Sequence, residues 1–228
     1  MLKKKDGKKE IYNIALDGPA GAGKSTIAKE LSKALDILYL DTGAMYRALG
    51  LKAYNNKVDM YDDTQIKRLL GATRIDVKYV KGAQRTCLDK KDVSDKIREP
   101  HIGKAASDIS AIPAVRYKMV ELQRQIASRC SMVLDGRDIG TYVLPKAEFK
   151  FYITARPEIR AERRYRELLE KGQTAVLEDV LKEINIRDGN DSKRAVAPLK
   201  KADDAVEIDT SDMTAEQAVE TIIKKILC

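Results

Sequence analysis

The feature that most constrains this chain is a glycine-rich motif near its N-terminus. Residues 18–25 read GPAGAGKS and match the pattern G-x-x-x-x-G-K-[ST]. An apolar run at 11–17 (IYNIALD) predicts a buried strand before the motif, and a helix is predicted after it, from about Lys24 to Leu35. Backbone N–H groups in such a loop, together with the N-terminus of the following helix, surround phosphate groups. The motif in this context predicts a phosphate-binding loop (P-loop) in an α/β protein.

Two side chains of the loop have specific expected roles. Lys24 is expected to reach the β- and γ-phosphates of a nucleoside triphosphate, and the hydroxyl of Ser25 is expected to bind Mg²⁺. The loop alone does not name an activity, because GTPases, helicases, motor ATPases and small-molecule kinases all contain it.

The rest of the chain alternates strands with helices. Further strands are predicted at 37–41, 131–135, 149–154 and 205–209, with helices from about residue 44 and near 214–226. This alternation predicts a five-stranded parallel sheet with helices on both faces. Four of the five predicted strands end in aspartate, which places acids at the carboxyl edge, where such sheets bind ligands.

Two stretches interrupt the alternation. Residues 58–100 contain two alternating runs joined by Lys81-Gly82, a β-hairpin signal, and are expected to form a small insert. Residues 157–195 are arginine-rich and helical, with Gly172 and Gly189 as expected helix breaks. That composition suits a mobile lid that grips phosphates; an ordinary solvated helical hairpin is the alternative.

A second phosphate site is expected at the sheet edge. Thr42 and Gly43 follow the second strand and can cap a helix, and Arg47 can fork onto a phosphate from about one turn further along. The segment Asp135-Gly-Arg-Asp138 ends another strand and places an arginine and two acids at the same edge of the sheet. An ordinary arginine–aspartate pair on the surface is the alternative interpretation of this segment. Residues 187–194 (RDGNDSKR) place two arginines and an acid on a short segment expected to be mobile, which suits a transition state with dispersed phosphoryl charge.

Composition restricts the class of ligand. The net charge is +8, which suits either a nucleic acid or a multiply charged phosphate. The chain has only 10 Tyr and 2 Phe and no Trp, so it is poorly supplied for stacking on nucleic-acid bases. A small anionic ligand is therefore favoured over a nucleic-acid polymer.

Composition also bears on location. No apolar run approaches the ~20 residues that span a bilayer, so no membrane association is expected. Residues 1–10 read as a basic disordered tail without the apolar segment of a signal peptide. The three cysteines, Cys87, Cys130 and Cys228, show no metal spacing, and free thiols indicate a cytoplasmic protein. A monomer is expected.

One motif favours a different class. Residues 56–59 (NKVD) match the guanine-binding pattern NKxD of GTPases, which would make the chain a nucleotide-dependent switch. They come only about 30 residues after the P-loop and follow a predicted helix, not a late core strand. No D-x-x-G segment stands in a suitable place, so the match is interpreted as coincidental.

The chain as a whole resembles the bacterial cytidylate kinases over residues 11–226. The resemblance is carried by DGPAGAGKST at 17–26, LDTGAMYR at 40–47, AASDISAIPAVR at 105–116, LDGRDIGT at 134–141 and RDGNDSKRAVAPL at 187–199. It implies a P-loop nucleoside monophosphate kinase, in which one domain at 11–226 has an insert-bearing monophosphate-binding region at about 42–115 and a lid at about 157–195. It also implies ATP-dependent phosphorylation of CMP and dCMP with Mg²⁺. A UMP/CMP or dephospho-coenzyme A kinase-like enzyme is the alternative.

The resemblance also implies roles for individual residues. The residues implied to hold ATP are Gly18, Pro19, Ala20, Gly21, Ala22, Gly23, Lys24, Ser25 and Thr26. Those implied to hold the CMP phosphate are Thr42, Arg47 and Arg137, and those implied to surround cytosine are Ser107, Arg116, Asp138 and Arg194. Arg187 and Asp191 would reach the ribose and the transferring group, and Arg163 would be a lid arginine. Lys24, Arg137, Arg163 and Arg187 form the expected catalytic set.

Overall fold

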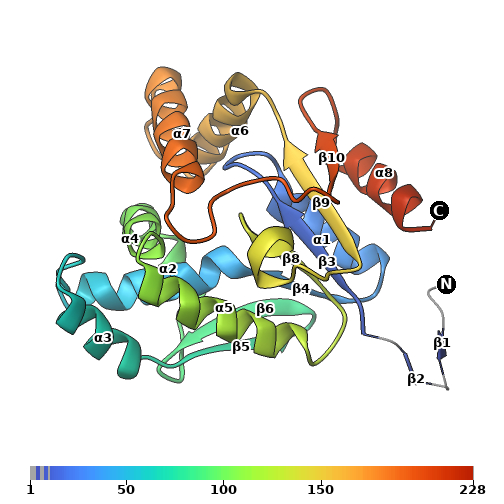
Figure 1. Ribbon diagram of the computed structural model, residues 1–228. Coiled ribbons are helices and arrows are strands. Elements are labelled where there is room, and N and C mark those ends of the chain that lie inside the picture. The colour runs from blue at the N-terminus through green and yellow to red at the C-terminus, as the bar shows by residue number, and fades with distance from the viewer. Residues whose placement is uncertain (1–3, 6–7, 10, 228) are drawn as a thin grey trace. The chain divides into compact units, whose positions relative to one another are not determined.

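The computed structural model describes residues 4–5, 8–9 and 11–227 (Figure 1). Lys4–Lys5 (β1) and Lys8–Lys9 (β2) pair as short antiparallel strands within the predicted disordered tail, whose other residues lie outside the described part of the chain. The chain divides into two units, one formed by Met1–Leu38 with Arg129–Cys228 and the other by Tyr39–Ser128.

The first unit contains the P-loop and most of the five-stranded sheet. After β1 and β2 its elements are β3 (Asn13–Asp17), α1 (Lys24–Ala34), β8 (Met132–Asp135), a single π-helical turn η2 (Ile139–Val143), β9 (Phe149–Thr154), α6 (Pro157–Glu170), α7 (Leu177–Ser192), β10 (Val206–Asp209) and α8 (Ala215–Leu227). The division between the units falls within β4 (Leu38–Asp41), an edge strand.

The sheet confirms the predicted fold class. Its strand order is β10-β9-β3-β8-β4, and β3 pairs in parallel with both β8 and β9. The central segments Ile14–Leu16 and Met132–Leu134 are fully buried, as expected for strands covered by helices on both faces. All five strands lie within two residues of their predicted bounds.

Helices α6 and α7 form a hairpin within the first unit and lie side by side in Figure 1. Ala161 of α6 and Val180 and Ile184 of α7 form a small hydrophobic core between them. The chain turns after α6 at Gly172, with φ of 72°, as predicted. The predicted break at Gly189 is wrong, because α7 continues through it to Ser192. A glycine inside a helix costs only about 1 kcal/mol relative to alanine, which the packing of α7 tolerates.

The second unit contains the insert. Its elements after β4 are α2 (Thr42–Asn55), α3 (Asp63–Gly71), β5 (Ile75–Val80), β6 (Ala83–Leu88), β7 (Lys91–Asp92), a 3₁₀ turn η1 (Lys96–Arg98), α4 (Pro100–Ser110) and α5 (Pro113–Ala127). The predicted hairpin is confirmed: β5 and β6 pair antiparallel, and Lys81 and Gly82 both have positive φ, as a two-residue type I′ turn requires. The NKVD segment begins at the end of α2, not after a late strand of the large sheet.

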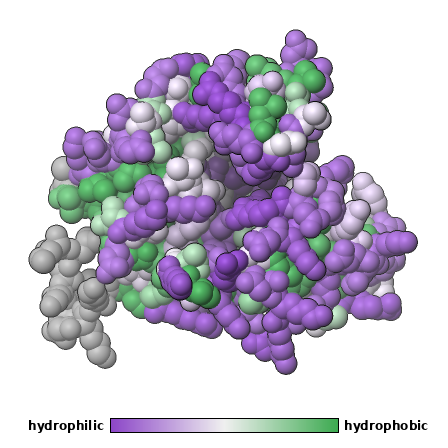
Figure 2. Space-filling model, turned by 180° about the vertical axis from the view of Figure 1, so that it is seen from behind, coloured by the Kyte–Doolittle hydropathy of each residue, from purple (hydrophilic) through white to green (hydrophobic). Residues whose placement is uncertain are grey.

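The face in Figure 2 is mostly hydrophilic, with hydrophobic residues in small scattered groups. This pattern is ordinary for a protein surface. Among the described residues, every helix is too short or too polar to pass through a bilayer.

Candidate active site

The P-loop connects β3 to α1, and close packing fixes its backbone. Gly18 has φ of 144°, and a Cβ at this position would lie 1.9 Å from the carbonyl oxygen of Ile153 in β9, so only glycine fits. Gly23, in the left-handed region, is the N-cap of α1. The loop therefore ends at a helix N-terminus, where N–H groups and the helix dipole favour an anion.

Lys24 is the first residue of α1, and its side chain is buried inside the loop. Its Nζ donates a hydrogen bond of 2.6 Å to the carbonyl oxygen of Pro19. Burial holds the pKa of Lys24 well below its usual range, with further lowering by the charges of Arg137 and Arg187 and opposition from Asp135 and Asp17. A phosphate beside this lysine would favour its charged form.

Ser25 and Asp135 form a pair of oxygen donors beside the loop. Ser25 Oγ donates to Asp135 Oδ2 at 2.6 Å, and Asp135 is the last residue of β8. No group of three His, Cys, Asp or Glu residues suited to a metal occurs in the described chain. Mg²⁺ fits this arrangement nevertheless, because it is commonly bound by one or two protein oxygens together with substrate phosphates and water.

Asp17, at the end of β3, fixes the segment that follows β8. Its two carboxylate oxygens accept from the N–H groups of Ile139 and Gly140, each at 2.7 Å. Burial raises the pKa of Asp17 to about 7, and Asp138 adds to the rise, while the two N–H groups and Lys24 oppose it. This clamp sets the start of η2 and, with it, the position of the preceding Arg137-Asp138.

A buried charge cluster brings predicted residues together in the first unit. Arg137 Nε donates to Asp191 Oδ2 at 2.8 Å, and Arg194 Nη2 bonds to Asp191 Oδ1. Although burial alone would raise it, the pKa of Asp191 is held below its usual range by Arg137, Arg194 and Arg187. The segment predicted to be short and mobile instead begins inside α7, because residues 187–192 complete the last turns of that helix.

Arg163 of α6 lies near the P-loop, and its hydrogen bonds are to Thr210. Its guanidinium donates to Thr210, to Oγ1 at 3.0 Å and to the carbonyl oxygen at 2.6 Å. A Cβ at Gly23 would lie 3.9 Å from Arg163 Nη1. Arg163 is therefore placed beside the P-loop, and its role as a lid arginine stays a prediction.

In the second unit, Asp41 organises the start of α2. The predicted cap at Thr42 is wrong: Asp41 is the N-cap, and its Oδ1 accepts from the N–H of Ala44 at 2.8 Å. Its Oδ2 lies 2.7 Å from Arg98 Nη2 and 3.4 Å from Arg47 Nη2. Burial would raise the pKa of Asp41, but Arg47 and Arg98 hold it below the usual range. Arg47, which is predicted to bind the acceptor phosphate, therefore shares the Asp41 carboxylate with a second arginine, Arg98.

The predicted cytosine-binding residues of this unit lie on α4 and α5. Ser107 is half-buried, and its carbonyl oxygen accepts from Ser110 Oγ at 2.8 Å. Arg116 is only 1% exposed, donates to the carbonyl oxygen of Ser110 at 3.3 Å and lies 5.7 Å from the ring centroid of Tyr46. These contacts fix Arg116 and link both helices to α2.

Sequence reasoning placed Asp17 and Asp135 at the ligand-binding edge of the sheet, because each ends a core strand, but it gave neither residue a role in the site. It missed Arg98, which carried no signal, because only the folded insert brings η1 to Asp41.

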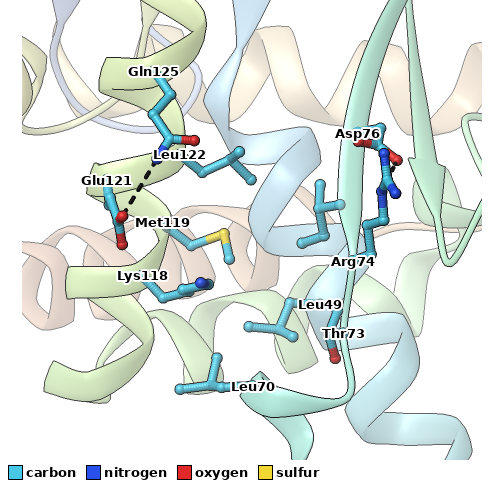
Figure 3. Close-up of a pocket in the computed structure, with 11 residues that line it drawn as sticks. Leu49, Leu70, Thr73, Arg74, Asp76, Lys118, Met119, Glu121, Leu122 and Gln125 are labelled. Carbon is cyan, nitrogen blue, oxygen red and sulfur yellow. Dashed lines mark hydrogen bonds and ion pairs between the residues drawn. The ribbon is translucent and has the colours of Figure 1, made fainter.

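A groove in the second unit lies between α5 and the segment from α3 to β5 (Figure 3). None of the predicted site residues lines it. Leucine and methionine side chains line much of it, and four of its polar residues form two pairs: Arg74 with Asp76 and Glu121 with Gln125. The groove is therefore interpreted as a packing feature of the insert.

Comparison with known proteins supports the resemblance. Residues 14–227 match the family model described as cytidylate kinase. The chain is 48% identical over 212 residues to the cytidylate kinase of Caldicellulosiruptor saccharolyticus, with 93% of this chain and 94% of that one covered. It is 46% identical over 219 residues to the cytidylate kinase of Lactobacillus johnsonii, with 96% and 95% covered.

Solved structures support the fold. An uncharacterised protein from Eubacterium ventriosum matches with a TM-score of 0.53 at 15% identity, over 95% of this chain and 98% of that one. A shikimate kinase from Bacteroides thetaiotaomicron matches with a TM-score of 0.50 at 12% identity, over 96% and 100%. At such low identity these likenesses concern the fold alone. The family model, which matches nearly the whole described chain, and the sequence relatives together show that this chain belongs to the cytidylate kinase family.

Proposed function

We propose that this chain transfers the γ-phosphoryl group of ATP to CMP, and to dCMP, forming CDP and dCDP. The observation that carries the proposal is the convergence of Arg137 and Arg187 on Lys24 at the P-loop, close enough to lower the pKa of that lysine. A phosphate group beside these three cations would favour the charged form of Lys24, and the triphosphate with its acceptor phosphate supplies such a group.

The residues divide the work as follows. In the first unit, Gly18–Thr26 hold the triphosphate, and Arg137, Arg163 and Arg187 stabilise charge on the transferring group. Arg137 also holds the acceptor phosphate, as do Thr42 and Arg47 of the second unit, where Ser107 and Arg116 contact the cytosine. Asp138 and Arg194 complete the cytosine contacts, and Asp191 with Arg187 reaches the ribose.

The chemistry requires no strong general base, because the acceptor phosphate is already anionic. The protein's contribution is to align the acceptor oxygen with the γ-phosphoryl group and to exclude water. When bound by Ser25 and Asp135, Mg²⁺ would neutralise charge on the phosphate oxygens.

The remaining parts of the proposal concern the setting of the enzyme. The α6–α7 hairpin is the lid, and residues 42–115 are the monophosphate-binding region. The enzyme acts as a cytoplasmic monomer on small molecules, with neither a nucleic-acid polymer nor a membrane as partner. The free thiols of Cys87 and Cys130 suit such a reducing compartment.

A label-transfer experiment tests the reaction class. ATP labelled in the γ-phosphate, incubated with Mg²⁺, CMP and the protein, should give labelled CDP and little labelled inorganic phosphate. The reason is that the proposed site aligns an acceptor phosphate with the γ-phosphoryl group and shields it from water. Label appearing in inorganic phosphate at the same rate with and without CMP would contradict the proposal and indicate a hydrolase or a GTPase-like switch.

A further inference from the structure

Both polar groups of the Ala20 backbone, in the P-loop, are held by side chains that have no role in the mechanism above. The N–H of Ala20 donates to Asp188 Oδ1 at 3.2 Å, and the carbonyl oxygen of Ala20 accepts from Arg160 Nη1 at 3.0 Å. Arg160 lies in α6 and Asp188 in α7. The loop is therefore tied to both helices of the hairpin through one residue.

Arg160 is built into this junction. It is only 4% exposed, and its Nε donates to the carbonyl oxygen of Ala155 at 2.9 Å. Its Nη1 also forms an ion pair of 2.5 Å with Asp188 Oδ2. A buried guanidinium is costly unless such partners satisfy it, and its planar fork lets it bond in two directions at once.

The junction also involves direct packing. A Cβ at Gly21 would lie 3.1 Å from both the Cβ and the carbonyl oxygen of Arg160, so the first turn of α6 touches the loop. The preceding carbonyl, of Pro19, is bonded to Lys24 on the inner side of the loop. In the P-loop, the peptide groups of Ala20 are therefore bonded to side chains of α6 and α7, whereas the carbonyl group of Pro19 is bonded to Lys24.

We propose that Arg160 and Asp188 are positioning residues that hold the P-loop in the shape that accepts a nucleotide polyphosphate. Neither residue needs to touch the nucleotide. Without the pair, the peptide groups of Ala20 lose their fixed partners, and the loop must be ordered when the nucleotide binds, which weakens binding. The inference rests on the proposed function only in taking ATP as the nucleotide.

The test uses Asp188→Asn and Arg160→Lys in the full chain, with ADP–Mg²⁺ as the binding probe in titration calorimetry. Asparagine keeps the shape and loses the charge. Lysine keeps the charge but cannot bond to Ala155 and Ala20 together. Each variant should raise the Kd for ADP by about tenfold, the scale of a lost charge-assisted hydrogen bond. The KM for CMP should stay within about twofold of the parent. A general disturbance of the fold would not raise the Kd for ADP and leave the KM for CMP unchanged.

Two controls sharpen the result. Glu183→Gln removes a charge from an exposed position on α7 and should leave the Kd for ADP unchanged. The double variant Arg160→Lys/Asp188→Asn should bind ADP about as tightly as the single variant with the higher Kd. The effects should not add, because both changes break the same junction. If Asp188→Asn does not fold, Asp188→Glu replaces it in the test. This change displaces the carboxylate by one methylene and should also weaken the binding of ADP.

Three results would overturn the proposal: an unchanged Kd for ADP in either folded single variant, additive losses in the double variant, or equal losses for ADP and CMP. Because ADP binding needs no acceptor, the calorimetric part of the test holds whether or not CMP is the acceptor.

Discussion

Replacing Lys24 with alanine should lower kcat for phosphoryl transfer by about a hundredfold or more, the scale seen when a preorganised charge donor is lost. The ammonium lies 2.6 Å from the carbonyl oxygen of Pro19, inside the loop. A bound triphosphate would offer it more strongly charged oxygens, and negative charge on those oxygens shifts during transfer. An interaction that strengthens in the transition state acts on kcat. Initial rates at saturating ATP and CMP measure the effect.

The loss should not come from unfolding. Burial and two neighbouring arginines, Arg137 and Arg187, hold the pKa of Lys24 below its usual range, so the folded protein gains little from this charge. Urea unfolding should therefore show no large loss of stability in Lys24→Ala. Lys33→Ala is the matched control, since Lys33 lies on the same helix, is exposed and pairs only with Glu30 in the described structure. A Lys24→Ala enzyme with parental kcat and a raised KM for ATP would contradict a role in the transition state.

Replacing Asp138 with alanine should reduce the ratio of kcat/KM for CMP to that for UMP by about tenfold to a hundredfold. Cytosine presents an N4 amino donor where uracil presents an O4 acceptor, so a carboxylate attracts the first and repels the second. One good contact to a base edge is worth about 1–3 kcal/mol of discrimination, which corresponds to this range. Asp138 is only 5% exposed, and its carbonyl oxygen accepts from the N–H groups of Tyr142 and Val143, so its backbone is fixed.

The alternative is that Asp138 acts only by orienting Arg137, and the structure shows which other groups hold that arginine. Arg137 already has its Nε on Asp191 and its Nη1 on the carbonyl oxygen of Gly136. If Asp138 acts only through Arg137, Asp138→Ala should slow CMP and UMP equally and leave the ratio unchanged. Asp203→Ala, at an exposed position, is the control and should change neither value. An unchanged ratio in Asp138→Ala would remove this residue from the base-reading role.

The large sheet and the P-loop were accessible from sequence because their signals are local. Buried parallel strands appear as short apolar runs, and the loop glycines meet a steric demand that no other residue satisfies, as Gly18 against Ile153 shows. The β5–β6 hairpin was accessible for the same reason, since Lys81-Gly82 fits the positive φ values of its turn.

The predictions from sequence were wrong or incomplete where two neighbouring residues could fill the same role, or where contacts between distant parts of the chain decide the structure. Both Asp41 and Thr42 can cap a helix, and only the folded insert, which places Arg98 beside the carboxylate, favours Asp41. Gly189 looked like a break, but the packing of α7 outweighs its weak helix propensity. The junction of Arg160 and Asp188 joins residues 28 positions apart and has no local signature. The assignment of individual residues to CMP remains a prediction, which the variants above test.

Acceptor specificity tests the central claim most directly. The purified protein would be given ATP–Mg²⁺ with each of CMP, dCMP, UMP, AMP, GMP, shikimate and dephospho-coenzyme A, and ADP formation would be followed at equal acceptor concentrations. The account predicts the highest kcat/KM values for CMP and dCMP, because the proposed cytosine contacts pair with N4, O2 and N3 of that base. Turnover of AMP, GMP, shikimate or dephospho-coenzyme A at about ten times the rate of CMP, a preference of 1.4 kcal/mol in the wrong direction, would contradict it.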